Sequence, residues 1–176
     1  MPDHLVLDAS AAVAIARGEP TADRIRSIIH DHVAADGEIV VPDHFWLEVI
    51  NVLVRRYHRN ADGVIHAIRE LDELDLVTRE IDRPLLLLAL QSMLSAELTG
   101  YDAAYLALAE IVDGRLLTLD DRLAGAAGER AIPHLPEGPA RSSEQAAVYG
   151  EAARLTDLSA FGAYLAELRR GAEATV

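Results

Sequence analysis

Four acidic residues stand where a hydrophobic segment meets a turn or a helix: Asp8 in LVLDAS, Glu48 in FWLEVIN, Asp102 in TGYDAAYLALA and Asp120 in LLTLDDRL. A carboxylate at the carboxyl end of a buried strand faces the crevice where open α/β sheets bind ligands. Several such groups gathered there repel one another unless a cation joins them. The pattern therefore predicts a metal site, and the leading hypothesis for its function is a reaction at phosphodiester bonds.

Each acid also has a plainer interpretation. Asp8, Asp102 and Asp120 could each begin a helix, where a carboxylate accepts backbone N–H groups and contributes roughly 0.5–2 kcal/mol without any metal. Glu48 is harder to explain in this way, because it lies inside an apolar helical segment where an unpaired carboxylate costs several kcal/mol or stays protonated. Asn51, one helical turn later, could hydrogen-bond to Glu48 and orient it.

The composition excludes several other chemistries. The chain has no Cys, so disulfides and thiolate metal sites are excluded. His30 and His32 form the one close histidine pair, but this spacing on a helix points the rings to different faces, so we expect the histidines to be surface or ordinary core residues. All sixteen basic residues are Arg, which rules out a catalytic lysine. The net charge of −13 argues against a broad basic surface, so a polyanionic substrate must be held locally.

Short apolar strands alternate with amphipathic helices along the chain, which is typical of an α/β fold with a central parallel sheet. The expected strands are residues 4–8, 38–42, 75–80 and 115–119. The expected helices are residues 11–18, 21–33, 44–54, 62–74, 83–97 and 102–112, with a short one from Asp120. Ser10 and Asp43 are the expected caps of the first and third of these helices, and Pro84 lies in the first turn of the fifth.

The 176 residues are enough for one sizeable core but short for two ordinary domains. We expect a domain over residues 1–133, followed over 134–176 by a linker and a helical C-terminal extension. Two helices are predicted there, near 143–153 and 158–170, and the second carries Leu158, Phe161, Leu165 and Leu168 at helical spacing. These apolar residues could pack on their own domain, on a second subunit or in a groove that otherwise binds a partner.

The longest apolar run, LLLLAL from Leu85 to Leu90, is far too short to span a membrane, and residues 1–10 lack the pattern of a signal peptide. We therefore expect a cytoplasmic protein without a membrane partner. The apolar segment 83–97 offers more hydrophobic surface than one small domain needs, which predicts a homodimer.

Taken together, the four acids and their neighbours resemble the motifs of the PIN-domain ribonucleases, above all the toxin subunits of VapBC toxin–antitoxin modules. The resemblance runs from about Leu5 to Gly128. Asp8 stands with Ser10 as D-x-S, Glu48 with Asn51 as E-x-x-N, and Asp120 with Thr118 as T-x-D, while Asp102 takes the place of the third acid. Each motif alone is weak evidence, but the four occur in the family's order.

The resemblance implies a three-layer α/β/α domain and a Mg²⁺- or Mn²⁺-dependent endoribonuclease that leaves 5′-phosphate and 3′-hydroxyl ends. Hard cations of this kind prefer oxygen ligands. Asp8 and Asp102 are the expected direct ligands, and Glu48 and Asp120 would bind through water, complete a second metal site or orient the attacking water. Ser10, Asn51 and Thr118 would support the ligands. The number of metal ions stays open.

The family also implies partners, namely an RNA substrate, a cognate antitoxin protein and a second copy of the chain. The RNA strand could be steered by nearby arginines such as Arg17, Arg55, Arg56 and Arg122, although for any one of them a solvated helix face is the better interpretation. Asp121 could supplement Asp120 at the metal, but a cap or surface role is the better interpretation.

Two alternatives belong to other classes of function. An aspartyl-nucleophile phosphohydrolase of the haloacid-dehalogenase type also places an acid after its first strand, but it needs D-x-D and a lysine, whereas position 10 is Ser and the chain has no Lys. The other alternative is a PIN-fold protein that binds metal or RNA without cleaving it.

Overall fold

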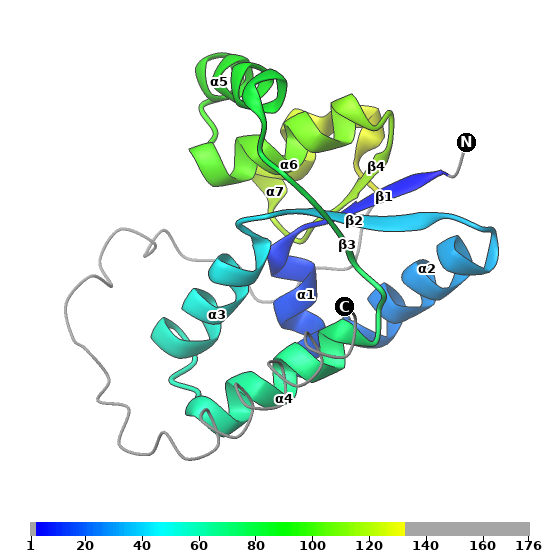
Figure 1. The fold of residues 1–176 in the computed structure, drawn as a ribbon, viewed down its shortest axis with the longest axis vertical. Coiled ribbons are helices and arrows are strands. Elements are labelled where there is room, and N and C mark those ends of the chain that lie inside the picture. The colour runs from blue at the N-terminus through cyan, green and yellow to red at the C-terminus, as the bar shows by residue number, and fades with distance from the viewer. Residues whose placement is uncertain (1–2, 133–176) are drawn as a thin grey trace, which may run out of the picture.

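The computed structural model describes residues 3–132, which contain a four-stranded sheet flanked by helices (Figure 1). The strands lie in the order β3-β2-β1-β4 and every neighbouring pair is parallel, as in the expected fold. Their bounds are β1 His4–Leu7, β2 Glu38–Pro42, β3 Val77–Arg79 and β4 Arg115–Leu117. Since all four strands run the same way, their carboxyl ends meet at one edge of the sheet.

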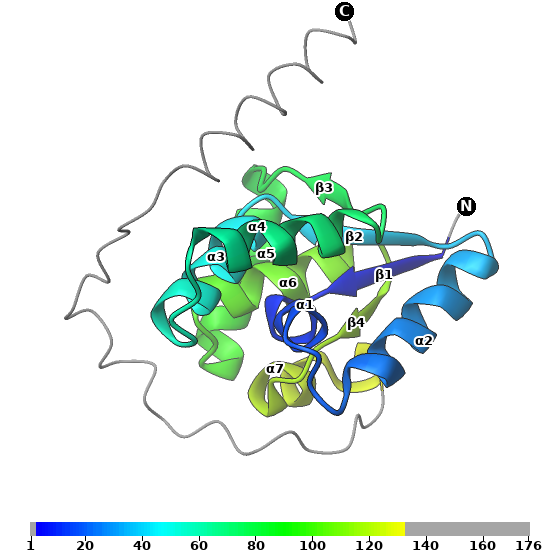
Figure 2. The same cartoon turned by 90° about the horizontal axis from the view of Figure 1, so that it is seen from below.

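Helices cover both faces of the sheet and give three layers (Figures 1 and 2). One face carries α1 Ala9–Ala16, α2 Ala22–Ala34, α3 Phe45–Arg55 and α4 Ala61–Asp72. The other carries α5 Arg83–Ala96, α6 Gly100–Ile111 and α7 Asp121–Ala127, and the described chain closes with the short 3-10 helix η1, Gly128–Arg130. The three-layer α/β/α arrangement is thereby confirmed.

The core explains why the central segments are almost continuously apolar. Leu5, Val6 and Leu7 of β1 are fully buried, because helices cover the strand on both faces. Helix α6 is buried without interruption from Ala103 to Ala109, and its alanines allow it to approach β1, β2 and β4 closely. Asp8 and Asp102 extend from these two rigid elements.

Two expected helix caps are wrong. Ser10 lies inside α1, and Asp8 takes the N-cap position, where its carbonyl accepts the N–H groups of Ala11 and Ala12. Asp43 is not the cap of α3 either, because His44 precedes the helix and the Asp43 carboxylate lies 3.4 Å from the N–H of Ile81. In both cases the side chain forms a hydrogen bond with a residue far away in the sequence. The local sequence does not reveal such a contact.

The other differences are small. The third and fourth strands are shorter than expected, and the helix predicted at 102–112 begins earlier, at Gly100, because Thr99 caps it. The predicted linker and the two predicted C-terminal helices lie outside the described residues. Among residues 3–132, no helix is long and apolar enough to cross a membrane.

Candidate active site

The predicted site residues are held at the edge where the parallel strands end. Asp8 directly follows β1, and its N–H donates to the carbonyl of Leu117 at 3.0 Å. Because Leu7 and Leu117 are paired in the sheet, Asp8 and Thr118 leave adjacent strands side by side. Pairing between β1 and β4 thus joins two motifs that are more than 100 residues apart in the sequence.

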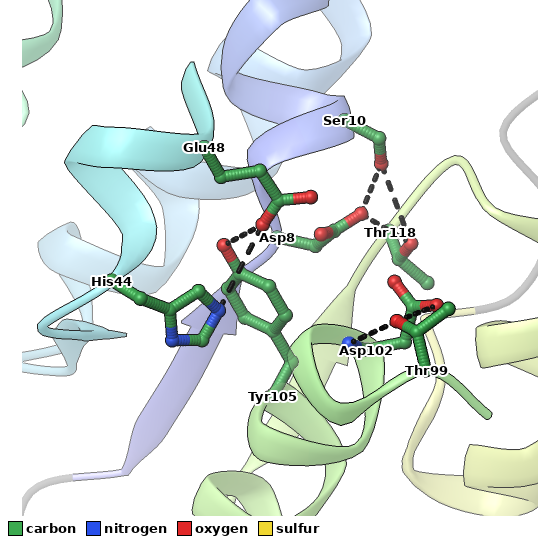
Figure 3. Close-up of polar contacts among 8 residues, drawn as sticks. All are labelled: Asp8, Ser10, His44, Glu48, Thr99, Asp102, Tyr105 and Thr118. Carbon is green, nitrogen blue, oxygen red and sulfur yellow. Dashed lines mark hydrogen bonds and ion pairs between the residues drawn. The ribbon is translucent and has the colours of Figure 1, made fainter. Parts of the chain in front are cut away.

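Asp8 is buried, with 3% of its surface exposed, and its carboxylate is held by two hydroxyl groups. Ser10 and Thr118 both donate to Oδ2, the latter at 2.7 Å (Figure 3). The same two hydroxyl oxygens accept backbone N–H groups, that of Leu119 on Ser10 at 2.9 Å and that of Asp120 on Thr118 at 3.0 Å. This network fixes the orientation of the Asp8 carboxylate and of the loop between β4 and α7.

Glu48 approaches the same region from α3, and 27% of its side chain is exposed. The phenol of Tyr105 on α6 donates to Glu48 Oε2 at 2.9 Å (Figure 3). His44, one turn earlier on the chain, places Nε2 3.8 Å from the same oxygen. Asn51 is exposed further along α3, and its expected role toward Glu48 stays a prediction.

Tyr105 is affected by burial and by two carboxylates. Burial raises the pKa of Tyr105 far above its ordinary value, and the negative charges of Glu48 and Asp8 raise it further. The phenol therefore stays protonated and acts as a hydrogen-bond donor to Glu48.

Asp102 lies in the first turn of α6, close to the helix N-terminus. Thr99 caps the helix by accepting the N–H of Asp102 at 3.2 Å, and its hydroxyl donates to Asp102 Oδ2 at 2.7 Å. Asp102 also acts on His44, whose pKa is lowered by burial and raised in part by Asp43 and Asp102. Figure 3 shows Asp102, Asp8 and Glu48 extending into one region from α6, β1 and α3.

Asp120 has a local structural role. It is the N-cap of α7, and its Oδ1 accepts the N–H groups of Arg122 and Leu123 at 2.9 and 3.0 Å. It is tied to the Asp8 network through the hydrogen bond of its own N–H to Thr118. Asp121 is exposed at the start of the helix.

Between residues 3 and 132, no three His, Asp or Glu side chains stand together as ligands of one metal ion. Thr118 joins Asp120 to Asp8, Tyr105 joins Glu48 to α6, and Asp102 extends into the same region from the start of α6 (Figure 3). The assignment of the four acids as metal ligands stays a prediction.

A family model for the PIN domain matches residues 5–129 of this chain. The chain belongs to the PIN domain family. PIN domains are generally nucleases. None of the curated proteins matches the chain.

Several solved structures share this PIN fold. PAE2754 from Pyrobaculum aerophilum, known from a crystal structure, is 25% identical in sequence and has a TM-score of 0.52. The match covers 74% of this chain and 83% of that chain. A toxin–antitoxin complex from Klebsiella pneumoniae is 18% identical, with a TM-score of 0.54 over 73% and 95%. VapC20 from Mycobacterium tuberculosis, a toxin that cleaves the sarcin–ricin loop, is 14% identical, with a TM-score of 0.55 over 73% and 99%. The chain therefore has the fold of VapC toxins.

Sequence reasoning missed two residues of this PIN-domain site, Tyr105 and His44. Tyr105 follows Asp102 by three positions and His44 precedes Glu48 by four, so each lies on the same helical face as an acid or next to it. These spacings of three and four residues could have indicated that both side chains lie near the predicted site. His44 packs against Tyr105 and Tyr101, with ring centroids 5.0 and 5.5 Å apart, and thereby lines the region between α3 and α6.

The arginines considered for RNA contacts differ in their surroundings. Arg17 lies over the ring of Tyr57, 3.6 Å from its centroid, and pairs with Glu19. Arg122 donates to the carbonyl of Glu97 after α5. Arg55 and Arg56 are exposed at the end of α3.

Proposed function

We propose that this PIN-domain protein is a Mg²⁺- or Mn²⁺-dependent endoribonuclease and the toxin of a type II toxin–antitoxin module. The observation that carries the proposal is the extension of Asp8, Glu48 and Asp102 into one region at the carboxyl edge of a PIN sheet, where the Tyr105 phenol donates to Glu48. The proposed products carry 5′-phosphate and 3′-hydroxyl ends, as expected when water attacks the phosphodiester.

The chemistry of the donor set fits a hard divalent cation. The donors are carboxylates, and Mg²⁺ usually keeps several waters while binding one or two protein carboxylates. Asp8 and Asp102 would hold the ion directly, and Glu48 and Asp120 would hold it through water. This arrangement is compatible with acids that approach one another without forming a closed cage of ligands.

A bound Mg²⁺ or Mn²⁺ would make water easier to deprotonate and would offset the negative charge that develops on the phosphate. The protein's own contribution is positional. Ser10 and Thr118 hold the Asp8 carboxylate, and Thr99 holds that of Asp102, so these groups need little reorganisation when substrate binds. In this proposal Glu48 also orients the attacking water.

The net charge of −13 requires that RNA be held through the proposed cations and a few arginines. Arg55 is the best candidate, because it is exposed near the end of the helix that carries Glu48; Arg56 is exposed beside it and lies 5.5 Å from the ring centroid of Tyr57. Arg17 and Arg122 already have partners within the fold.

An antitoxin protein and a second copy of the chain are the proposed partners. The first is suggested by the likeness to the Klebsiella toxin–antitoxin complex. The second is supported by the outer face of α5, where Leu86, Leu87, Leu90 and Leu94 are between 50% and 77% exposed. Apolar side chains gathered in this way commonly mark an interface.

The decisive experiment incubates the metal-free full-length protein with candidate single-stranded and loop RNAs, with chelator, Mg²⁺ or Mn²⁺. We expect cleavage only when a divalent ion is added, and product-end analysis should find 5′-phosphates. The Asp8→Asn protein is the control for contaminating nuclease. Binding of RNA without cleavage under all conditions would instead support a non-catalytic PIN-fold protein.

A further inference from the structure

Tyr105 links the two helices that carry Glu48 and Asp102. It lies on α6, three residues after Asp102, and is fully buried. Its hydroxyl reaches across to α3 and donates to Glu48 Oε2 at 2.9 Å (Figure 3). A buried phenol needs a hydrogen-bond partner, and here the partner is a predicted catalytic carboxylate.

The phenol can act only as a donor to this carboxylate. A tyrosine hydroxyl is protonated at neutral pH and an ionised carboxylate only accepts, so the hydrogen bond runs from the phenol to Glu48 Oε2. The ring itself is restrained by His44, which packs edge-on against it with centroids 5.0 Å apart. Tyr105 is therefore a rigid donor at a fixed position.

Glu48 needs such a restraint. A glutamate on a helix has several rotatable bonds, and this one is partly exposed, so without a partner its carboxylate would sample positions away from Asp8. The hydrogen bond from Tyr105 holds Oε2 next to a phenol that also lies within the field of Asp8.

We propose that Tyr105 is a positioning residue that holds the Glu48 carboxylate toward Asp8 and thereby sets the affinity of the site for a divalent ion and the rate of cleavage. The inference rests on the proposed function, but it concerns a residue outside the four acids. The competing explanation is that Tyr105 only ties α3 to α6, in which case its hydroxyl affects stability alone.

Tyr105→Phe removes the hydroxyl and keeps the ring. We expect the dissociation constant for Mn²⁺, measured by calorimetry on the RNA-free protein, to rise about tenfold, since partners that orient metal ligands typically contribute 10–100-fold. The single-turnover cleavage rate should fall by a similar factor, while the KM for RNA stays unchanged. The matched control is Tyr57→Phe, which removes a hydroxyl from the tyrosine beneath Arg17 and should change neither quantity.

A second pair of variants shows whether Tyr105 acts through Glu48. In a Glu48→Gln background, Tyr105→Phe should cause no further loss, because the carboxylate to be positioned is gone. If the losses caused by Glu48→Gln and by Tyr105→Phe multiplied in the double variant, the proposal would be overturned. Should Tyr105→Phe fail to fold, as judged by circular dichroism, Glu48→Asp provides a second route, because the shorter side chain keeps its charge but withdraws from the phenol. It should show the same loss of Mn²⁺ affinity, and wild-type affinity in this variant would contradict the inference.

The outcomes separate this inference from the proposed function. If the wild type binds Mn²⁺ and cleaves RNA, and Tyr105→Phe does both equally well, the positioning role is wrong and the nuclease assignment stands. If the wild type binds Mn²⁺ in a Tyr105-dependent way but cleaves no RNA, the positioning role stands and the nuclease assignment is wrong. Absence of Mn²⁺ binding by the wild type would overturn both.

Discussion

Individual residues at this site serve the fold and the proposed chemistry together. Asp8 stands at the N-cap of α1, yet its side chain makes no capping hydrogen bond and is held by Ser10 and Thr118. A cap needs only an exposed carboxylate that accepts backbone N–H groups, whereas this carboxylate is buried, which costs free energy, and is held by two hydroxyl groups. This use of Asp8 favours a ligand role over simple capping.

The first prediction concerns the two proposed direct ligands. Asp8→Asn and Asp102→Asn should each abolish divalent-dependent cleavage and leave the circular dichroism spectrum native, because Asn has a similar shape but no charge. Thermal melts supply an independent measurement: Mn²⁺ at about 100 times its dissociation constant should stabilise the wild type by about 2.7 kcal/mol and should stabilise each variant less. Cleavage at the wild-type rate by both variants would refute the assigned site.

A second residue-scale prediction concerns His44. Burial lowers its pKa in the folded state below the ordinary value of 6.5, so the unfolded chain binds this proton more readily. The stability contributed by keeping His44 neutral is therefore present above about pH 6.5 and is lost as the pH falls through the folded-state pKa.

Urea denaturation of the metal-free protein at about pH 7.5 and about pH 5.5 tests this effect. The wild type should lose more unfolding free energy on acidification than His44→Gln, which has no ring to protonate. The nearby carboxylates Asp43, Glu48 and Asp102 are present in both proteins, so the difference between the two isolates His44. Equal losses would show that the pKa of His44 is the same in the folded and unfolded states.

At the scale of elements, the site depends on how helices begin. Thr99 fixes the first turn of α6 and holds Asp102, and Asp120 fixes the first turn of α7. Helix starts are suited to such sites, since their backbone geometry is fixed by capping while the side chains of the first turn stay accessible. The capping interpretation and the catalytic interpretation of these acids are therefore compatible.

The prediction at this scale separates the two roles of Asp120. Asn caps helices about as well as Asp, whereas Ala does not, so Asp120→Ala should lower the unfolding free energy by about 1 kcal/mol and Asp120→Asn by clearly less. Both variants should lose RNA cleavage if the charge is needed at the metal. Wild-type cleavage by Asp120→Asn together with a destabilised Asp120→Ala would show that Asp120 is only a cap.

At the scale of the whole molecule, α5 stands out because it packs on α6 and leaves an apolar face outward. Its buried residues Leu85, Ala89 and Ser92 face the domain, while Leu86, Leu90 and Leu94 form an exposed row at helical spacing. A single exposed leucine needs no explanation, but a row of them does.

We expect this row to lie in a homodimer interface. Burying one leucine contributes about 1.5–3 kcal/mol, so Leu90→Glu should raise the dimer dissociation constant at least about tenfold. Sedimentation of the full-length protein measures this shift. Val33→Glu, at an exposed apolar position on α2, is the control and should leave the association unchanged. A wild type that is monomeric at micromolar concentration would contradict the proposal.

The sequence by itself determined the architecture and the candidate acids. Continuous apolar runs, as at Leu5–Leu7 and Ile39–Val41, predict strands covered on both faces, and the helices between them predict parallel pairing. The position of an acid directly after such a run then predicts where it lies in the fold. These inferences succeed because hydrophobic periodicity is a local property of the chain.

Only the tertiary structure decided which side chains meet. The sequence contains no sign that Thr118 donates to Asp8, since the contact depends on the register between β1 and β4. Nor does it show that Tyr105 reaches Glu48, because within α6 this tyrosine resembles an ordinary core residue. Hydrogen bonds between distant segments depend on the packing of whole elements, whereas the residue types record only which groups are able to form them.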